Sequence, residues 1–153
     1  MSILSYTHEI LVRDLNQLHK EVESTPDELL WATAPGIINP VGTLAFHLCG
    51  NLRHFIGAKL GGSDYVRNLE SEFSHDPRSK TELLSHIEDT IEQVDAGLGS
   101  LSEADLLREM PDPPAQHKGR TVGFFLIQLC CHFHRHAGQL NYLKRIKMAQ
   151  LDF

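Results

Sequence analysis

The sequence predicts an all-α fold, a four-helix bundle, and three observations lead to this class. Apolar residues recur at helical spacing in four long segments. Connections rich in proline or glycine separate these segments, and no segment shows the alternation of polar and apolar residues that is typical of a strand. A chain of 153 residues is long enough for one hydrophobic core, so we expect a single domain over residues 1–153.

The first helix is expected from about Ser2 to Glu23. One apolar stripe runs along it, formed by Ile3, Ile10, Leu11, Leu15, Leu18 and Val22. Thr25 as a cap and Pro26 in the first helical position then predict a short helical turn through Trp31. These signals predict a long helix followed by a brief, separate one.

The second long helix is expected from Pro40 to about Leu60, with Asn39 as its cap and Gly61-Gly62 as its end. The acidic segment 61–78 that follows has no long apolar pattern, so we interpret it as a linker. Its length allows the helices on either side to run parallel, whereas a short turn would force them to be antiparallel.

The third long helix begins with Ser79-Lys80-Thr81-Glu82, a capping box, and ends near Gly97-Leu98-Gly99. Its apolar residues are Leu83, Leu84, Ile87, Ile91, Val94 and Leu98. Three prolines and one glycine in segment 108–120 predict a loop. Thr121 is the predicted cap of the fourth helix, which is expected from Val122 to about Met148.

Two histidines of the fourth helix, His132 and His136, are four residues apart and therefore lie on one face. His134 is rotated by roughly 200° from His132 and points elsewhere. An i, i+4 pair of imidazoles can bind one divalent cation, and His47 on the second helix is the candidate third ligand. Three neutral imidazoles leave open coordination positions, which is typical of a reactive site, and zinc or nickel would suit them.

Other interpretations of these histidines stay open. A histidine on an apolar face is often a hydrogen-bonded core residue rather than a ligand. Asn51 and His54 share the face of His47, and Gln139 follows His136 by three residues. These three side chains either line a pocket at the site or lie at the polar boundary of the core.

Composition argues against several classes of function. The formal charge of −6 disfavours a nucleic-acid partner and an anionic membrane surface. We find neither a signal-peptide pattern at Met1 nor a run of about 18 apolar residues, so we expect a cytoplasmic protein without a membrane segment. Cys49, Cys130 and Cys131 are expected to pack as small apolar groups rather than to form disulfides.

Two motifs resemble the DinB-like superfamily: Leu44-Ala45-Phe46-His47-Leu48, and segment 132–140 with its His-x-x-x-His and Gly138-Gln139. The resemblance covers nearly the whole chain. It implies a bundle in up-down-down-up order, a divalent metal on His47, His132 and His136, and a homodimer, for which the apolar first and fourth helices also argue.

Function within this family is diverse, and some members resemble thiol S-transferases. The resemblance therefore implies a metal-dependent enzyme that activates a low-molecular-weight thiol for reaction with an electrophile. Two alternatives remain at this point. One is a non-catalytic module that binds a metal or small ligand. The other is a metal-dependent hydrolase, in which the metal lowers the pKa of water.

Overall fold

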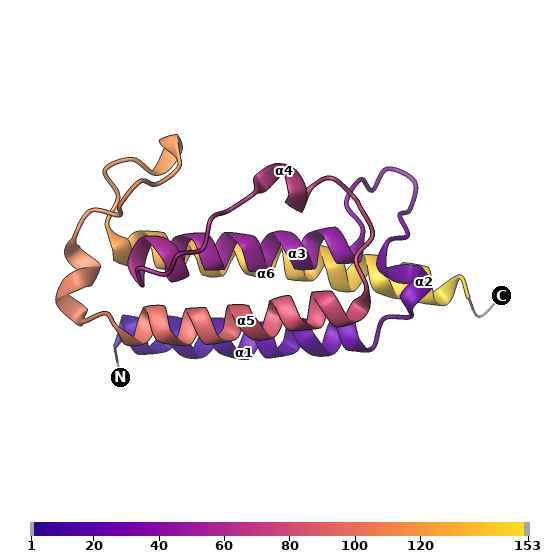
Figure 1. Cartoon of the computed structure of the whole chain (residues 1–153), viewed down its shortest axis with the longest axis horizontal. Helices are drawn as coiled ribbons and strands as arrows, with labels where there is room; N and C mark the ends of the chain where they lie inside the picture. The colour runs from indigo at the N-terminus through magenta and orange to yellow at the C-terminus, as the bar shows by residue number, and fades with distance from the viewer. Residues whose placement is uncertain (1, 152–153) are drawn as a thin grey trace.

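The computed structural model describes residues 2–151, and four long helices dominate it (Figure 1). The long helices are α1 (Ile3–Glu23), α3 (Val41–Leu52), α5 (Lys80–Gly99) and α6 (Val122–Ala149). Shorter helical segments connect them: α2 (Asp27–Leu30), η1 (Arg53–Leu60), α4 (Leu69–Glu72), η2 (Glu103–Leu107) and η3 (Ala115–His117). Residues 2–151 form no strand, so the predicted all-α class is confirmed.

Each long helix packs against two others around one core. α1 lies along α5 and α3 lies along α6 (Figure 1), while contacts between α3 and α5 and between α1 and α6 complete the bundle. Leucines such as Leu15 and Leu48 are fully buried there, which stabilises the fold by about 1.5–3 kcal/mol for each side chain. Ile3, predicted to begin the α1 stripe, is instead 55 % exposed, and Thr7 takes the first buried position.

Local sequence determines where the helices begin. Ser79 and Glu82 form the predicted capping box: the Glu82 amide donates to Ser79 Oγ at 3.2 Å, and the Ser79 amide donates to the Glu82 carboxylate at 2.8 Å. Thr121 caps α6 as predicted. α2 and α3 begin one residue later than predicted, because Pro26 and Pro40 have extended ψ angles of 142° and 170° and so act as caps.

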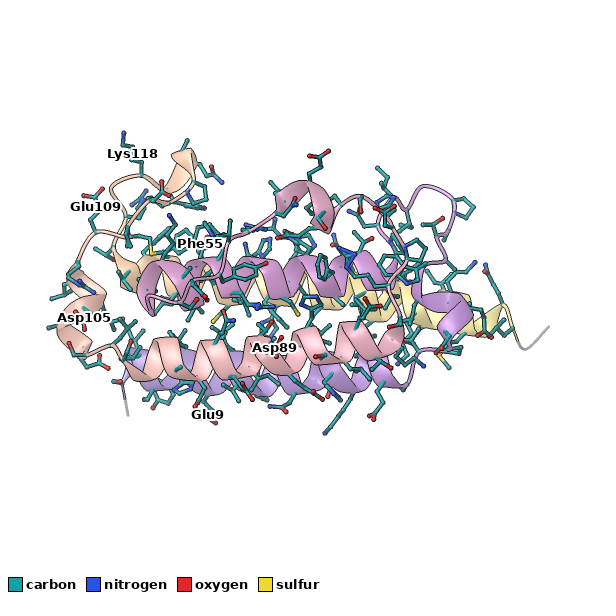
Figure 2. The ribbon with its side chains drawn as sticks, in the orientation of Figure 1. Glu9, Phe55, Asp89, Asp105, Glu109 and Lys118 are labelled. Atoms are coloured by element: carbon teal, nitrogen blue, oxygen red, sulfur yellow. The ribbon has the colours of Figure 1, made fainter. Side chains whose placement is uncertain are left out.

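Two long connections lie on the α3 side of the bundle (Figure 1). The first returns along the bundle from η1 to α5 and includes α4. The second joins η2 to α6, and Figure 2 labels Glu109 and Lys118 on it. Backbone hydrogen bonds from Met110 to Arg120 at 2.9 Å and from Val122 to Arg108 at 2.8 Å close the base of this second connection. Both connections contribute residues to the pocket described below.

The connection between η1 and α5 is long, as the sequence predicts. The up-down-down-up order of the four long helices stays a prediction. Within residues 2–151, no helix has both the length and the apolar character that crossing a membrane requires.

Candidate metal centre

Three imidazoles meet between α3 and α6. His47 comes from α3, and His132 and His136 come from consecutive turns of α6. Each offers one ligand atom, and the three atoms all lie within 4.8 Å of one another. The ring centroids are 5.1 Å apart for His47 and His132, 5.2 Å for His47 and His136, and 4.6 Å for His132 and His136. The structure therefore brings together the three histidines that the sequence pointed to, in a group that could hold a metal ion.

The distance between the ring nitrogens suits a shared cation. The Nε2 atoms of His47 and His132 are 3.3 Å apart. Two nitrogens that each lie about 2.05 Å from a tetrahedral zinc ion are separated by about 3.3 Å. A hydrogen bond between one N–H and one lone pair would give a similar distance, so this pair alone does not decide. His136 contributes a third ring nitrogen to the same group. A hydrogen bond joins only two nitrogens, whereas a cation can be bound by three.

A buried carboxylate fixes the orientation of His47. Oε2 of Glu72, at the end of α4, lies 2.8 Å from His47 Nδ1. An ionised carboxylate only accepts hydrogen bonds, so Nδ1 carries the proton and the lone pair of the neutral ring is on Nε2. Nε2 is the nitrogen that faces the other two rings. Carboxylates that orient a metal-binding imidazole in this way typically strengthen metal binding 10- to 100-fold.

Arg67 keeps Glu72 ionised although Glu72 is only 2 % exposed. Its Nε donates to Oε1 at 2.7 Å and its Nη2 donates to Oε2 at 2.7 Å, which is a two-pronged pairing. Burial by itself would raise the pKa of Glu72, but the hydrogen bonds from Arg67 and His47 hold that pKa below its usual value. Glu72 is therefore an acceptor at neutral pH.

Gly50 makes room for this carboxylate. It lies on α3 almost one turn after His47, and a Cβ atom placed there would overlap the Glu72 Oε1 atom and lie 2.7 Å from its Cδ. A larger side chain at this position would displace the Glu72 carboxylate from where it meets His47. The glycine therefore lets a carboxylate from a connecting segment reach a histidine inside the bundle.

The two α6 histidines differ in their outer partners. His136 Nδ1 donates to Gln139 Oε1 at 2.8 Å, so the lone pair of the neutral ring is on Nε2. His132 Nδ1 is buried and has no hydrogen-bond partner among residues 2–151. Burial lowers the pKa of His132 to about 4, assisted by His136 and His47, and burial also lowers the pKa of His136. Both rings are thus neutral near pH 7, which is the form that binds metals.

Asn51 and Gln139, which the sequence suggested as pocket residues, lie at the cluster, and His54 lies apart from it. Asn51 is one turn after His47 and lines a pocket of about 340 Å³ with His47 and His132. His54 is not among the lining residues and its ring packs on Phe55, with centroids 4.6 Å apart. A π-helical segment, η1, begins at Arg53, so the face expected from α-helical spacing does not continue through His54.

His134 faces away from the cluster, as predicted. Its Nδ1 bonds to the carbonyl of Cys130 at 3.1 Å, and its Nε2 lies 3.2 Å from an Asp14 carboxylate oxygen on α1. The cysteines do not belong to the three-residue ligand group. Cys49 is buried, and burial raises the pKa of its thiol to about 12, so it stays protonated.

Sequence reasoning missed Arg67, Glu72 and Gly50. The segment 61–78 was interpreted as an acidic linker, and one Glu among several acidic residues gives no sign that it will be buried. The prolines of segment 108–120 indicate only a loop, yet Pro114, Gln116 and His117 line the pocket. These contributions depend on how two connections fold back onto α3, which helix periodicity does not reveal.

A comparison with protein families supports the same assignment. The family model described as the DinB superfamily matches residues 10–140. No curated protein matches the sequence.

Proposed function

The chain belongs to the DinB superfamily, and we propose that it is a divalent-metal-dependent enzyme that transfers a low-molecular-weight thiol to an electrophile. The family assignment agrees with the resemblance seen in the two histidine motifs. The ligands would be the Nε2 atoms of His47, His132 and His136, and zinc or nickel would suit these nitrogen donors. The observation that carries the proposal is the opening of this cluster onto a pocket.

A site with three protein ligands and a pocket beside it has the composition of a reactive centre. Closed structural zinc sites use four protein ligands, whereas catalytic sites use three and keep a position for substrate. His47 and His132 line the pocket of about 340 Å³, so a small molecule can reach the cluster from it. When bound, a divalent cation supplies the positive charge that lowers a thiol pKa from about 8.5 towards neutrality.

The protein's own residues hold and orient the reactants. Glu72 and Gln139 keep the His47 and His136 rings in one orientation through their Nδ1 protons, so no ring has to turn during the reaction. In the transfer, a bond forms between the thiol sulfur and the electrophilic carbon. The bond from that carbon to its leaving group breaks, the leaving group takes the bonding electrons, and the thiol proton passes to solvent.

The pocket favours thiol transfer over hydrolysis. Among residues 2–151, no Asp or Glu lines it, and the nearby Glu72 carboxylate is occupied by Arg67 and His47. Metal-dependent hydrolysis commonly uses a carboxylate base beside the metal, as in the His-Glu-x-x-His motif. A thiol is more acidic than water and becomes a nucleophile without such a base.

The test measures conjugation of a bacillithiol-like thiol to monochlorobimane. Protein loaded with zinc or nickel is compared with metal-stripped protein and with the His47→Ala variant. We expect turnover from loaded protein only, and its return when metal is added back to the stripped wild type. Turnover that survives both chelation and His47→Ala would refute the metal-dependent mechanism. Metal binding without turnover for any thiol and electrophile tried would refute the assignment as an enzyme and support a binding module.

A further inference from the structure

In the part of the chain that the structure describes, the pocket beside the cluster contains basic side chains but no acidic ones. The ionisable residues that line it are imidazoles and two arginines, Arg67 and Arg135, and no carboxylate within residues 2–151 lines it. Glu72 neutralises Arg67, so Arg135 carries the uncompensated positive charge of this lining. A divalent cation on the three histidines would add to the positive charge. A ligand that fills this pocket therefore meets cationic groups at more than one point.

The two arginines are not equivalent. Both donor groups that Arg67 directs at Glu72 are used in the pairing described above, so Arg67 serves the protein itself. Arg135 follows His132 by three residues on α6, which places both on the same side of the helix. Within residues 2–151, its guanidinium has no ion pair and no hydrogen bond, and its five N–H donors stay available.

Arg135 directly precedes His136 on α6 and lines the pocket together with His47 and His132. An exposed arginine on a helix surface is common by itself. What sets this one apart from other surface arginines is that it lines a pocket that His47 and His132 also line.

Asn51 provides a second, independent sign of a ligand. Its side chain is 8 % exposed and lines the same pocket, yet its amide oxygen has no hydrogen-bond partner among residues 2–151. Leaving a buried acceptor unsatisfied costs about 1–3 kcal/mol. Such a group takes its partner from outside the fold, from a water molecule or from a ligand, and here that partner must be an N–H or O–H donor.

We propose that this pocket binds a substrate that carries a carboxylate, which Arg135 holds by paired hydrogen bonds while the reacting end lies beside the three histidines. The inference rests on the proposed function and names the chemistry of its substrate. The planar guanidinium matches a carboxylate in a two-pronged geometry, which a lysine could not provide. Asn51 would accept a hydrogen bond from a donor on the same molecule. The carboxylate belongs either to the thiol or to the electrophile.

The first test measures thiol binding without turnover. Protein loaded with cobalt(II) is titrated with 3-mercaptopropionate and with 2-mercaptoethanol, which lacks the carboxylate, and the sulfur-to-cobalt absorption band reports binding. When the thiol is the partner that carries the carboxylate, Arg135→Gln should weaken the binding of 3-mercaptopropionate on the order of 10- to 100-fold and leave the binding of 2-mercaptoethanol unchanged. Arg145 is an exposed arginine on the same helix, so Arg145→Gln is the matched control and should not change the binding of either thiol.

The second test measures the KM of two electrophiles, chloroacetate and chloroacetamide, of which only chloroacetate carries a carboxylate. A KM that Arg135→Gln raises for chloroacetate alone would identify the electrophile as the source of the carboxylate. A selective effect of Arg135→Gln on either carboxylate-bearing reactant supports the proposal. An equal effect on matched reactants with and without the carboxylate, or no effect in either test, overturns it. Binding of 3-mercaptopropionate that depends on Arg135, without turnover for any pair, refutes the proposed function alone. Turnover that does not depend on Arg135 refutes this inference alone.

Discussion

Helix α6 presents histidine and charged side chains on two faces, and the two faces differ in how those groups are partnered. Towards α1, the polar groups pair with one another: His134 lies against Asp14, and Lys144 donates to Glu21 Oε2 at 2.9 Å. Towards α3, His132 and His136 instead direct ring nitrogens at His47. The histidine and charged side chains of the first face find partners within the fold, although Asp14 Oδ2 makes no hydrogen bond among residues 2–151. The second face instead collects imidazole lone pairs that need a further partner.

Whether a buried polar group has partners within the fold distinguishes a structural group from a binding site better than its residue type does. Lys144 is 8 % exposed, yet its ammonium group also donates to the Glu21 carbonyl and to Ser24 Oγ, at 3.2 and 2.6 Å. Every donor there has an acceptor. His132 is half-buried, but its Nδ1 atom is fully buried and has no hydrogen-bond partner within residues 2–151. The α1 face therefore contributes to stability, and the α3 face holds the group that could bind a metal ion.

The largest effect is expected from removing one imidazole from the α3 face. His132→Ala leaves two ligands and should lose most of the bound metal, measured as metal per chain after desalting. His134→Ala, two residues away on the other face, should keep close to one ion per chain. If the His134 variant lost metal and the His132 variant kept it, the assignment of the two faces would be reversed.

A smaller effect is expected from the groups that orient His47. Glu72→Gln replaces an acceptor-only carboxylate by an amide that can also donate, so the tautomer of His47 is no longer fixed. We expect zinc affinity to fall by about 10- to 100-fold in competition with a chromophoric chelator. Glu70→Gln removes an exposed carboxylate from the same short helix and should leave the affinity unchanged. Equal affinities for all three proteins would exclude an orienting role for Glu72.

On the α1 face, the expected change is in stability and not in metal binding. Lys144→Met removes three hydrogen bonds and leaves Glu21 without its cation. We expect the free energy of unfolding in urea to fall by about 1–3 kcal/mol, with the metal content retained. Lys147→Met, on the same helix, serves as the control. A Lys144 variant that unfolds normally but loses metal would contradict the separation of the two faces.

The smallest expected effect is a pH dependence from Glu21. Burial would raise its pKa, but hydrogen bonds from Lys144, Gln17 and Asn141 hold the pKa below the ordinary value of 4.5. A lowered carboxyl pKa stabilises the folded state above the unfolded value, and this contribution disappears as pH falls through the folded value. The stability difference between wild type and Glu21→Gln should therefore shrink below about pH 4.5. A difference that grows with acidity would mean the opposite shift.

The core of the α3 face could be predicted because helical spacing is a local property. His132 and His136 are four residues apart, which places them on one face whatever surrounds the helix. The same spacing places His134 on a different face of the helix from His132 and His136. His47 was a weaker inference from one mid-helix histidine, and the contact between α3 and α6 brought it to the pair. The four long helices followed from periodicity in the same way.

The supporting residues could not be predicted, because they depend on long-range folding of irregular segments. Glu72 and Arg67 meet through the path of a connection, and their approach to His47 requires a glycine at position 50. His54 was placed by extending α-helical spacing into a segment that is π-helical. The homodimer and the single domain stay predictions, since nothing observed in this chain tests them.

X-ray absorption at the zinc edge of the metal-loaded protein, without added thiol, tests the central claim most directly. The account predicts nitrogen neighbours at about 2.0–2.1 Å with the multiple-scattering pattern of three imidazoles. That pattern should drop to two imidazoles in any residual metal of His136→Ala. A shell at about 2.3 Å, which marks cysteine sulfur, would contradict the account, and so would a wild-type spectrum with fewer than three imidazoles.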